Sequence, residues 1–362
     1  MHTSYSDADR TDSHEPVSTR GRTAENKDGI VTTATDLETC MSGAPEVVAV
    51  GSALVDEQYL VSNLPEADGG AYVYEESTGF GGVAANVAVA LSRLGRSTGV
   101  IVRLGNDDAA EAVEANLRSE GVAVARVSKS DDERSTYCKV FRDPDGERAI
   151  ITGGGAAKHL ELDADDEAYL RSAEVVFTNG FCPDRVTRRL VDLAAAGEIR
   201  LAFDLAAPLE GLEGRGIERE TLEDLLSHLT LFVANETSIR SYLEAEGREA
   251  IDILRARGVE RGAVTRSERG ALLWNDGEIL DIPALDVDAV DTTGAGDAFV
   301  SGLIHRWLLS ENSIEDAGRF GAAAGGYNCT KEGARGGMVG EECLEAVLRE
   351  QPLRRDRKKS KR

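Results

Sequence analysis

Short apolar segments alternate with helix-length segments along most of the chain, and this alternation constrains the fold more than any other feature. The apolar segments are residues 47–50, 174–177, 201–204, 229–233 and 262–265. Continuous apolar strands separated by helical segments are typical of a mostly parallel sheet that helices cover on both faces. We therefore predict an α/β fold of three layers, with ligands bound beyond the carboxyl ends of the strands.

Two stretches depart from this alternation. Residues 57–80 and 134–151 have a half-polar pattern of period two, and we predict that they form a small β-sheet lid over a main domain spanning residues 46–350. Residues 1–45 contain no Phe or Trp and are rich in Ser, Thr, Asp, Glu and Gly. We predict that this extension and the basic tail, residues 351–362, are disordered.

The chain is strongly acidic, with 65 Asp and Glu against 41 Lys and Arg, of which only eight are Lys. Its net charge of −24 repels nucleic-acid phosphates and anionic lipid, so we expect neither nucleic acid nor membrane as a partner. A nucleic-acid role for the basic tail stays the alternative. An acid-rich, Lys-poor composition suits high salt, and we predict a halophilic protein.

The five cysteines are widely spaced and form no C-x-x-C pair, which argues against a disulfide framework or a zinc site. No apolar run approaches the roughly 18 residues of a membrane-spanning helix. We therefore expect a cytoplasmic protein.

Residues 291–299, which read D-T-T-G-A-G-D-A-F, form the most specific motif of the chain. Apolar residues follow them at helical spacing, so the glycines lie just before a helix N-terminus, where free backbone N–H groups and the positive end of the dipole meet. We predict that Gly294, Ala295 and Gly296 bind an anionic group. Asp297 either only complements the dipole or accepts a proton from a hydroxyl that attacks a bound phosphate.

This motif resembles the C-terminal signature of the ribokinase-like, pfkB-type carbohydrate kinases. The glycine pair at 81–82 and Asn86 resemble the N-terminal signature of that family, and Asp56 matches the Asp after its first strand. The resemblance implies a ribokinase-like three-layer sandwich and transfer of the γ-phosphate of ATP to a primary hydroxyl of a pentose- or ketose-type sugar. It implies Asp297 as the general base, with Asp56, Gly82 and Asn86 holding sugar hydroxyls.

The same resemblance implies sites for ATP and for metal ions. The residues that it assigns to the nucleotide are Asn235, Thr265, Glu268, Gly270 and Gly296. Glu236 would help to hold Mg²⁺, although Ser238 stands where the family has a second Glu. The residues that it assigns to a K⁺ site are Asp291, Thr293, Asn328, Lys331 and Gly333.

The acceptor stays open at this level. The basic side chains that could bind a phosphate already present on the sugar are Arg103, Arg134, Lys139 and Arg148. The alternatives are therefore a kinase of ribose 1-phosphate, of a fructose phosphate or of a nucleoside. A catalytically silent nucleotide-binding regulator is the alternative of another class, which the Ser at 238 favours. The resemblance also implies a homodimer formed through the lid.

Overall fold

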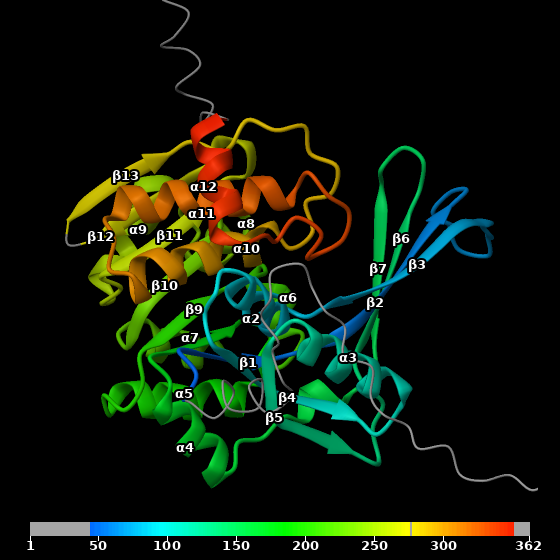
Figure 1. The fold of residues 1–362 in the computed structure, drawn as a ribbon, viewed down its shortest axis with the longest axis horizontal. Coiled ribbons are helices and arrows are strands. Elements are labelled where there is room, and N and C mark those ends of the chain that lie inside the picture. Colours follow the sequence, from blue (N-terminus) through cyan, green and yellow to red (C-terminus); the bar gives the residue numbers. More distant parts are fainter. Residues whose placement is uncertain (1–43, 276, 351–362) are drawn as a thin grey trace, which may run out of the picture. The chain divides into compact units, whose positions relative to one another are not determined.

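The computed structural model describes residues 44–275 and 277–350 of the chain (Figure 1). The segments that we predicted to be disordered, 1–45 and 351–362, lie outside these residues except for 44 and 45. In the described part of the chain, the main sheet has nine strands. Their order across the sheet is β13 (Glu278–Ile282), β12 (Ala271–Asn275), β11 (Arg261–Thr265), β10 (Leu229–Asn235), β9 (Leu201–Asp204), β8 (Val175–Asn179), β1 (Val47–Gly51), β4 (Thr98–Gly105) and β5 (Val122–Ser130).

The five apolar segments of the sequence form β1, β8, β9, β10 and β11, and these strands pair in parallel with their neighbours. Among the described strands of this sheet only β12 runs in the opposite direction, since it pairs antiparallel with both β11 and β13. The predicted α/β architecture is therefore confirmed, and the carboxyl ends of the parallel strands meet along one edge.

Successive side chains of a strand point to opposite faces of the sheet, and each face has its own core. Val47 and Ala49 belong to one core, whereas Val48 and Val50 belong to the other. The helices that cover the first face are α2 (Val83–Arg93), α3 (Asp108–Ser119), α10 (Ala295–Leu303), α11 (Ile314–Asn328) and α12 (Glu341–Glu350). The helices that cover the second face are α4 (Ala164–Ser172), α5 (Asp184–Ala195), α6 (Leu209–Glu213), α7 (Arg219–Leu226), α8 (Glu236–Leu243) and α9 (Gly247–Ala256).

A second, smaller sheet stands beside the first (Figure 1). Its strands, in order, are β3 (Val73–Gly81), β2 (Leu54–Val61), β6 (Tyr137–Arg142) and β7 (Arg148–Gly153). We call this sheet the lid. Its pairing is antiparallel except between β2 and β6, which run in parallel. Apolar side chains such as Tyr72 and Ile151 are exposed on it, and the dimer through the lid stays a prediction.

Helices α10 and α11 approach each other very closely. A Cβ added to Gly302 would lie 2.8 Å from the Cα of Gly321, and one added to Gly325 would lie 2.9 Å from the carbonyl oxygen of Ala295. These contacts fix both ends of α10 against α11. A π-helical turn, Ile304–Leu309, continues α10.

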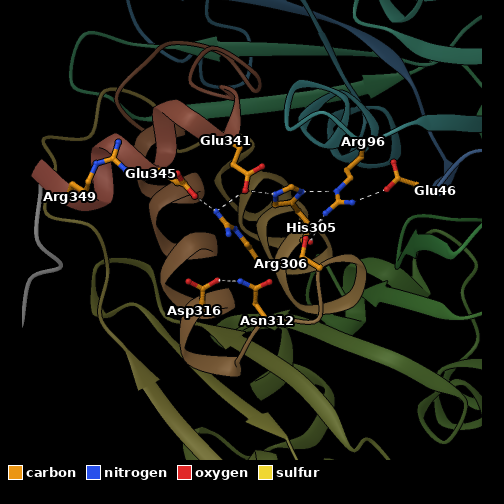
Figure 2. Close-up of polar contacts among 10 residues, drawn as sticks. Glu46, Arg96, His305, Arg306, Asn312, Asp316, Glu341, Glu345 and Arg349 are labelled. Carbon is orange, nitrogen blue, oxygen red and sulfur yellow. Dashed lines mark hydrogen bonds and ion pairs between the residues drawn. The ribbon is translucent and has the colours of Figure 1, made fainter. Parts of the chain in front are cut away.

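Arginine side chains connect the π-helical turn to α12 and to the residues just before β1 and β4 (Figure 2). Arg96 donates to Nδ1 of the buried His305 at 2.9 Å and to Glu46 at 2.8 Å. Arg306 forms an ion pair with Glu341, at the start of α12, at 2.8 Å. Burial lowers the pKa of His305, which favours the neutral ring that accepts from Arg96. The planar fork of Arg suits such multiple contacts better than Lys does.

No helix within residues 44–275 and 277–350 combines the length and the apolar character that crossing a bilayer requires.

We predict that Gly302→Ala lowers the free energy of unfolding by about 1–3 kcal/mol, because the new methyl group meets the backbone of α11. Gly211→Ala, in α6, is the matched control, because a Cβ there meets no atom within 4 Å. Ala in place of a helical Gly should raise the free energy of unfolding by about 0.5–1 kcal/mol there. Denaturant unfolding in concentrated KCl measures both, and equal effects of the two substitutions would contradict the packing described.

Candidate functional site

Polar residues end the parallel strands along one edge of the main sheet. Asn179 of β8 pairs in register with Asp204 of β9, and Asn235 of β10 pairs with Thr265 of β11. Gly51 ends β1 beside them, since a Cβ on Gly51 would lie 3.1 Å from Nδ2 of Asn179. Parallel sheets bind ligands at the carboxyl ends of their strands, and here that edge is lined by groups that can form hydrogen bonds.

The D-T-T-G-A-G-D motif turns into α10 at this edge. Gly294 has the left-handed φ of 72°, and a Cβ on it would lie 2.0 Å from the carbonyl oxygen of Ala334, so no other residue fits there without rearrangement. A Cβ on Gly296, by contrast, meets no atom within 4 Å. The space beside Gly296, in the first turn of α10, is therefore open, as an anion site there requires.

Asp297 lies in this first turn and is buried. Its Oδ2 accepts a hydrogen bond of 2.7 Å from Nδ2 of Asn86, which lies in the first turn of α2. The two signature motifs, more than 200 residues apart in the chain, therefore meet through their two polar side chains. The structure thus brings the predicted base together with one of the predicted sugar-binding residues.

The glycine pair brings Asp56 to the same place. A Cβ on Gly81 would lie 2.1 Å from Oδ2 of Asp56, so the carboxylate of β2 occupies the space that only a glycine leaves. Gly82 has φ of 94° and lies against the carbonyl oxygen of Ser52, where a Cβ would come within 2.4 Å. The pair therefore serves both to admit Asp56 and to start α2.

Three carboxylates of this cluster have raised pKa values. Burial raises the pKa of Asp297 to about 7, which Asn86 opposes as a hydrogen-bond donor. Burial also raises the pKa of Asp56 to about 6 and that of Asp204 to about 6. Repulsion from the carboxylates of Asp204 and Asp56 raises the pKa of Asp297 further. Such a cluster of perturbed carboxylates is typical of a functional site.

Two residues of this cluster were missed by the sequence analysis. Asp204 ends the apolar segment 201–204, and a carboxylate at the end of a buried strand was the available signal. Arg335 is buried behind Asn86 and donates to Oδ1 of that residue at 2.6 Å. An arginine among glycines, in the stretch G-A-R-G-G at 333–337, was a weak signal.

Apart from Gly296, which lies beside Asp297 in α10, the residues expected to bind ATP lie at the other end of the strand edge. Asn235 caps α8, since its Oδ1 accepts from the backbone N–H of Ser238 at 2.8 Å. Gly270, with φ of 84°, ends the turn that begins after Thr265, and Glu268 lies within that turn. The structure therefore brings these residues to one edge, while their role in nucleotide binding stays a prediction.

The expectation of Mg²⁺ at Glu236 fits this structure poorly, because the carboxylate of that residue is ion-paired with Arg269. Within the described residues, no group of three His, Cys, Asp or Glu side chains is placed to hold a metal ion. Mg²⁺ commonly binds through substrate phosphates with few protein ligands, so we assign it none here.

The residues expected to hold K⁺ form one hydrogen-bonded loop. Asp291 accepts from the backbone N–H of Thr293 and of Gly333, both at 2.9 Å. Nδ2 of Asn328 donates to the carbonyl oxygen of Thr293 at 2.9 Å, and the side chain of Lys331 is exposed. These hydrogen bonds order the loop, and its binding of K⁺ stays a prediction.

The strand register places the basic side chains of the lid on both of its faces, since Lys139 faces away from Asp56 whereas Arg148, opposite Arg142, is on the same face as Asp56. Lys139 is opposite Glu57 in the pairing of β6 with β2 and forms an ion pair with it at 2.6 Å. Because neighbouring residues of a strand face opposite sides, Lys139 lies on the side of the lid away from Asp56. Arg134 lies over the ring of Tyr137. The other two are Arg103, ion-paired with Glu133 at 3.6 Å, and Arg148, which is exposed in β7.

Comparison with known proteins gives consistent results. Residues 44–339 match the family described as "pfkB family carbohydrate kinase". The chain is 30% identical over 294 residues to an ATP-dependent ribose-1-phosphate kinase of Halopiger xanaduensis, covering 80% of this chain and 93% of that protein. It is 31% identical over 283 residues to a 2-dehydro-3-deoxygalactonokinase of Haloferax volcanii, covering 74% and 87%. The acid-rich composition is compatible with these haloarchaeal relatives.

Solved structures share the fold. A ribokinase of Arabidopsis thaliana in complex with ribose and ATP superposes with a TM-score of 0.74 at 24% identity, over 84% of this chain and 99% of that one. The two-sheet arrangement of a covered parallel sheet and a lid is therefore a ribokinase-like fold.

We predict that Asp297→Asn stabilises the protein above neutral pH. Because the folded pKa of Asp297, about 7, exceeds its ordinary value of 3.8, the free energy of unfolding of the wild type falls as pH rises between these values. Asn does not ionise, so the free energy of unfolding of the variant does not fall in this way. At high pH it should exceed that of the wild type by up to about 4 kcal/mol. Denaturant unfolding at about pH 5 and about pH 8 measures the difference, and a gain that does not grow with pH would contradict the burial of an ionising carboxyl.

Proposed function

Because the chain belongs to the pfkB family of carbohydrate kinases, we propose that it transfers the γ-phosphate of ATP to a primary hydroxyl of a pentose- or ketose-type sugar, with Asp297 as the general base. Enzymes of this family are phosphotransferases with an alcohol group as acceptor, and the chain is such a carbohydrate kinase. The acceptor itself and the residue roles below are our proposal.

One observation carries the assignment of the base. Asp297 is a buried carboxylate with a pKa of about 7, at the start of a helix and beside the open space at Gly296. A base is most effective when its pKa lies near the working pH, because enough of it is ionised and the ionised form still binds a proton well. A carboxylate that only complemented the helix dipole would be stabilised in its charged form, with a lowered pKa.

The proposed step needs three contributions from the chain and one from a metal ion. Asp56 accepts hydrogen bonds from sugar hydroxyls and orients the acceptor. Asp297 takes the proton of the attacking hydroxyl as its oxygen bonds to the γ-phosphorus, and ADP leaves. The backbone N–H groups of Gly294–Gly296 stabilise the negative charge on the transferred phosphoryl group. Mg²⁺, bound with the phosphates of ATP, would offset their charge.

The ATP would lie along the strand edge, with its phosphates toward α10 and its nucleoside toward Thr265 and Gly270. The row of strand ends from Asp204 to Thr265 supports this orientation, because it runs from the carboxylate cluster to the turn at 266–270. Closure of the lid over the acceptor would exclude water and suppress hydrolysis of ATP.

We predict that Asp297→Asn lowers kcat by about 10²–10⁴-fold, since the amide cannot accept the proton. The measurement is ADP formation from ATP with a panel of sugars, sugar phosphates and nucleosides in concentrated KCl with Mg²⁺. An unchanged affinity for an ATP analogue, together with the stability gain above, controls for misfolding. A variant with nearly full kcat would contradict the base assignment, and a wild type inactive on the whole panel would contradict the proposed class of acceptor.

A phosphorylated acceptor, such as ribose 1-phosphate, is the second candidate, and Arg215 favours it. The guanidinium of Arg215 lies over the ring of Phe181, 4.7 Å from its centroid, and forms no ion pair with the described residues. Burial raises the pKa of the Cys138 thiol and the charge of Arg215 opposes this, so the guanidinium lies near Cys138. Cys138 is opposite Asp56 in the pairing of β6 with β2.

A free guanidinium on the side of the lid that carries Asp56 could bind the phosphate of an acceptor. We predict that Arg215→Met raises KM for ribose 1-phosphate by about tenfold and leaves KM for ribose unchanged. Lys139→Met, on the other side of the lid, is the matched control and should change neither. Equal effects of Arg215→Met on both acceptors would remove the support for a phosphorylated substrate.

A further inference from the structure

Arg335 is a buried arginine whose charge has no partner of opposite charge in direct contact. Its side chain is 9% exposed, and no carboxylate of the described residues lies within ion-pair distance of it. A buried charge is expensive unless it is hydrogen-bonded and serves its surroundings. Burial lowers its pKa to about 10, so the guanidinium is still charged at neutral pH.

Neutral acceptors hold the guanidinium instead. Nε donates to Oδ1 of Asn86 at 2.6 Å, and Nη1 donates to Oδ1 of Asn116 in α3 at 2.9 Å. Nη2 donates to the carbonyl oxygen of Gly81 at 3.3 Å. Arg93 in turn donates to the carbonyl oxygen of Arg335 at 2.8 Å. The position of the guanidinium is therefore fixed from three elements, with its charge left unneutralised.

These contacts determine which way the amide of Asn86 faces. A guanidinium can only donate, so the oxygen of Asn86 must face Arg335. The nitrogen of Asn86 then faces Asp297 and donates to Oδ2 at 2.7 Å. The reverse orientation would set the amide oxygen against the carboxylate and the N–H groups against the guanidinium. Arg335 therefore excludes it.

We propose that Arg335 is a positioning residue for phosphoryl transfer, which locks Asn86 so that its amide N–H holds Asp297 toward the acceptor and supplies the positive charge that keeps Asp297 ionised. This inference rests on the proposed role of Asp297 as the base. Arg335 acts through Asn86 and through its field, without contact with the reacting atoms.

The charged groups around Asp297 explain why a cation is needed near it. Asp204, from the end of β9, and Asp56, from β2, both raise the pKa of Asp297 by repulsion, on top of the larger effect of burial. Asn86, from α2, and Arg335 are the groups that lower it. Arg335 also lowers the pKa of Asp56. Arg335 thus opposes the repulsion that the carboxylates of Asp56 and Asp204 exert on Asp297, while Glu120 and Arg93 act on Arg335 itself.

The test is the pH dependence of kcat for two variants. Arg335→Met removes the charge and the hydrogen bonds at similar volume, whereas Arg335→Lys keeps the charge and loses the planar fork. We expect Arg335→Met to move the acid limb of the kcat profile up by about one pH unit or more, because a nearby opposite charge favours the ionised carboxylate by that amount. Arg335→Lys should keep the limb within about half a unit of the wild type and lower kcat about tenfold through the loosened Asn86.

Arg118→Met is the matched control and should leave the profile unchanged, because Arg118 is an exposed arginine of α3 whose partner Glu114 keeps a second ion pair with Lys129. A merely structural role for Arg335 would lower kcat or stability in both variants without moving the limb, and that result would overturn the proposal. If Arg335→Met does not fold, a shift of the limb of about one unit in Arg335→Lys overturns it as well, because the charge is retained there. Failure of the proposed function is distinguishable, since Asp297→Asn would then be as active as the wild type whatever Arg335 does.

Discussion

The site is built around the burial of three carboxylates beside a single guanidinium. Asp56, Asp204 and Asp297 all have raised pKa values because water is largely excluded from them. Arg335 and the amide of Asn86 are the groups that offset this cost for Asp297. A fold selected for stability alone would avoid such a cluster, and its presence at the carboxyl edge of a parallel sheet is what a functional site predicts.

The rest of the architecture keeps this cluster in place. The parallel strands bring their polar ends to one edge, and the glycine pair at 81–82 lets β2 and α2 meet there. The crossing of α10 with α11 at Gly302 fixes the helix that carries Asp297. The turn at Gly294 lies against Ala334, next to Arg335, so the turn proposed to bind the phosphate and the arginine proposed to position Asn86 are joined by one close contact. Packing and chemistry are therefore supported by the same few glycines.

Features of the fold and site that local sequence patterns indicate could be predicted. Features that depend on contacts between residues far apart in the chain could not. The parallel sheet and the lid followed from hydrophobic periodicity, whereas a common site for Asp56, Asn86 and Asp297 followed from the family resemblance of their motifs. Arg335 was not predicted, because its role comes from contact with residues about 250 positions earlier. The outward side of Lys139 depends on the register of β6 with β2, which a period-two pattern leaves open.

The most direct test of the central claim is a crystal structure of the complex with a non-hydrolysable ATP analogue and an acceptor that the enzyme phosphorylates. The account predicts that one primary hydroxyl oxygen of the acceptor lies about 3 Å from a carboxylate oxygen of Asp297, with the γ-phosphorus on its other side and the N–H groups of Gly294–Gly296 on the phosphate. An acceptor hydroxyl bound by another base, or a γ-phosphate remote from α10, would contradict it.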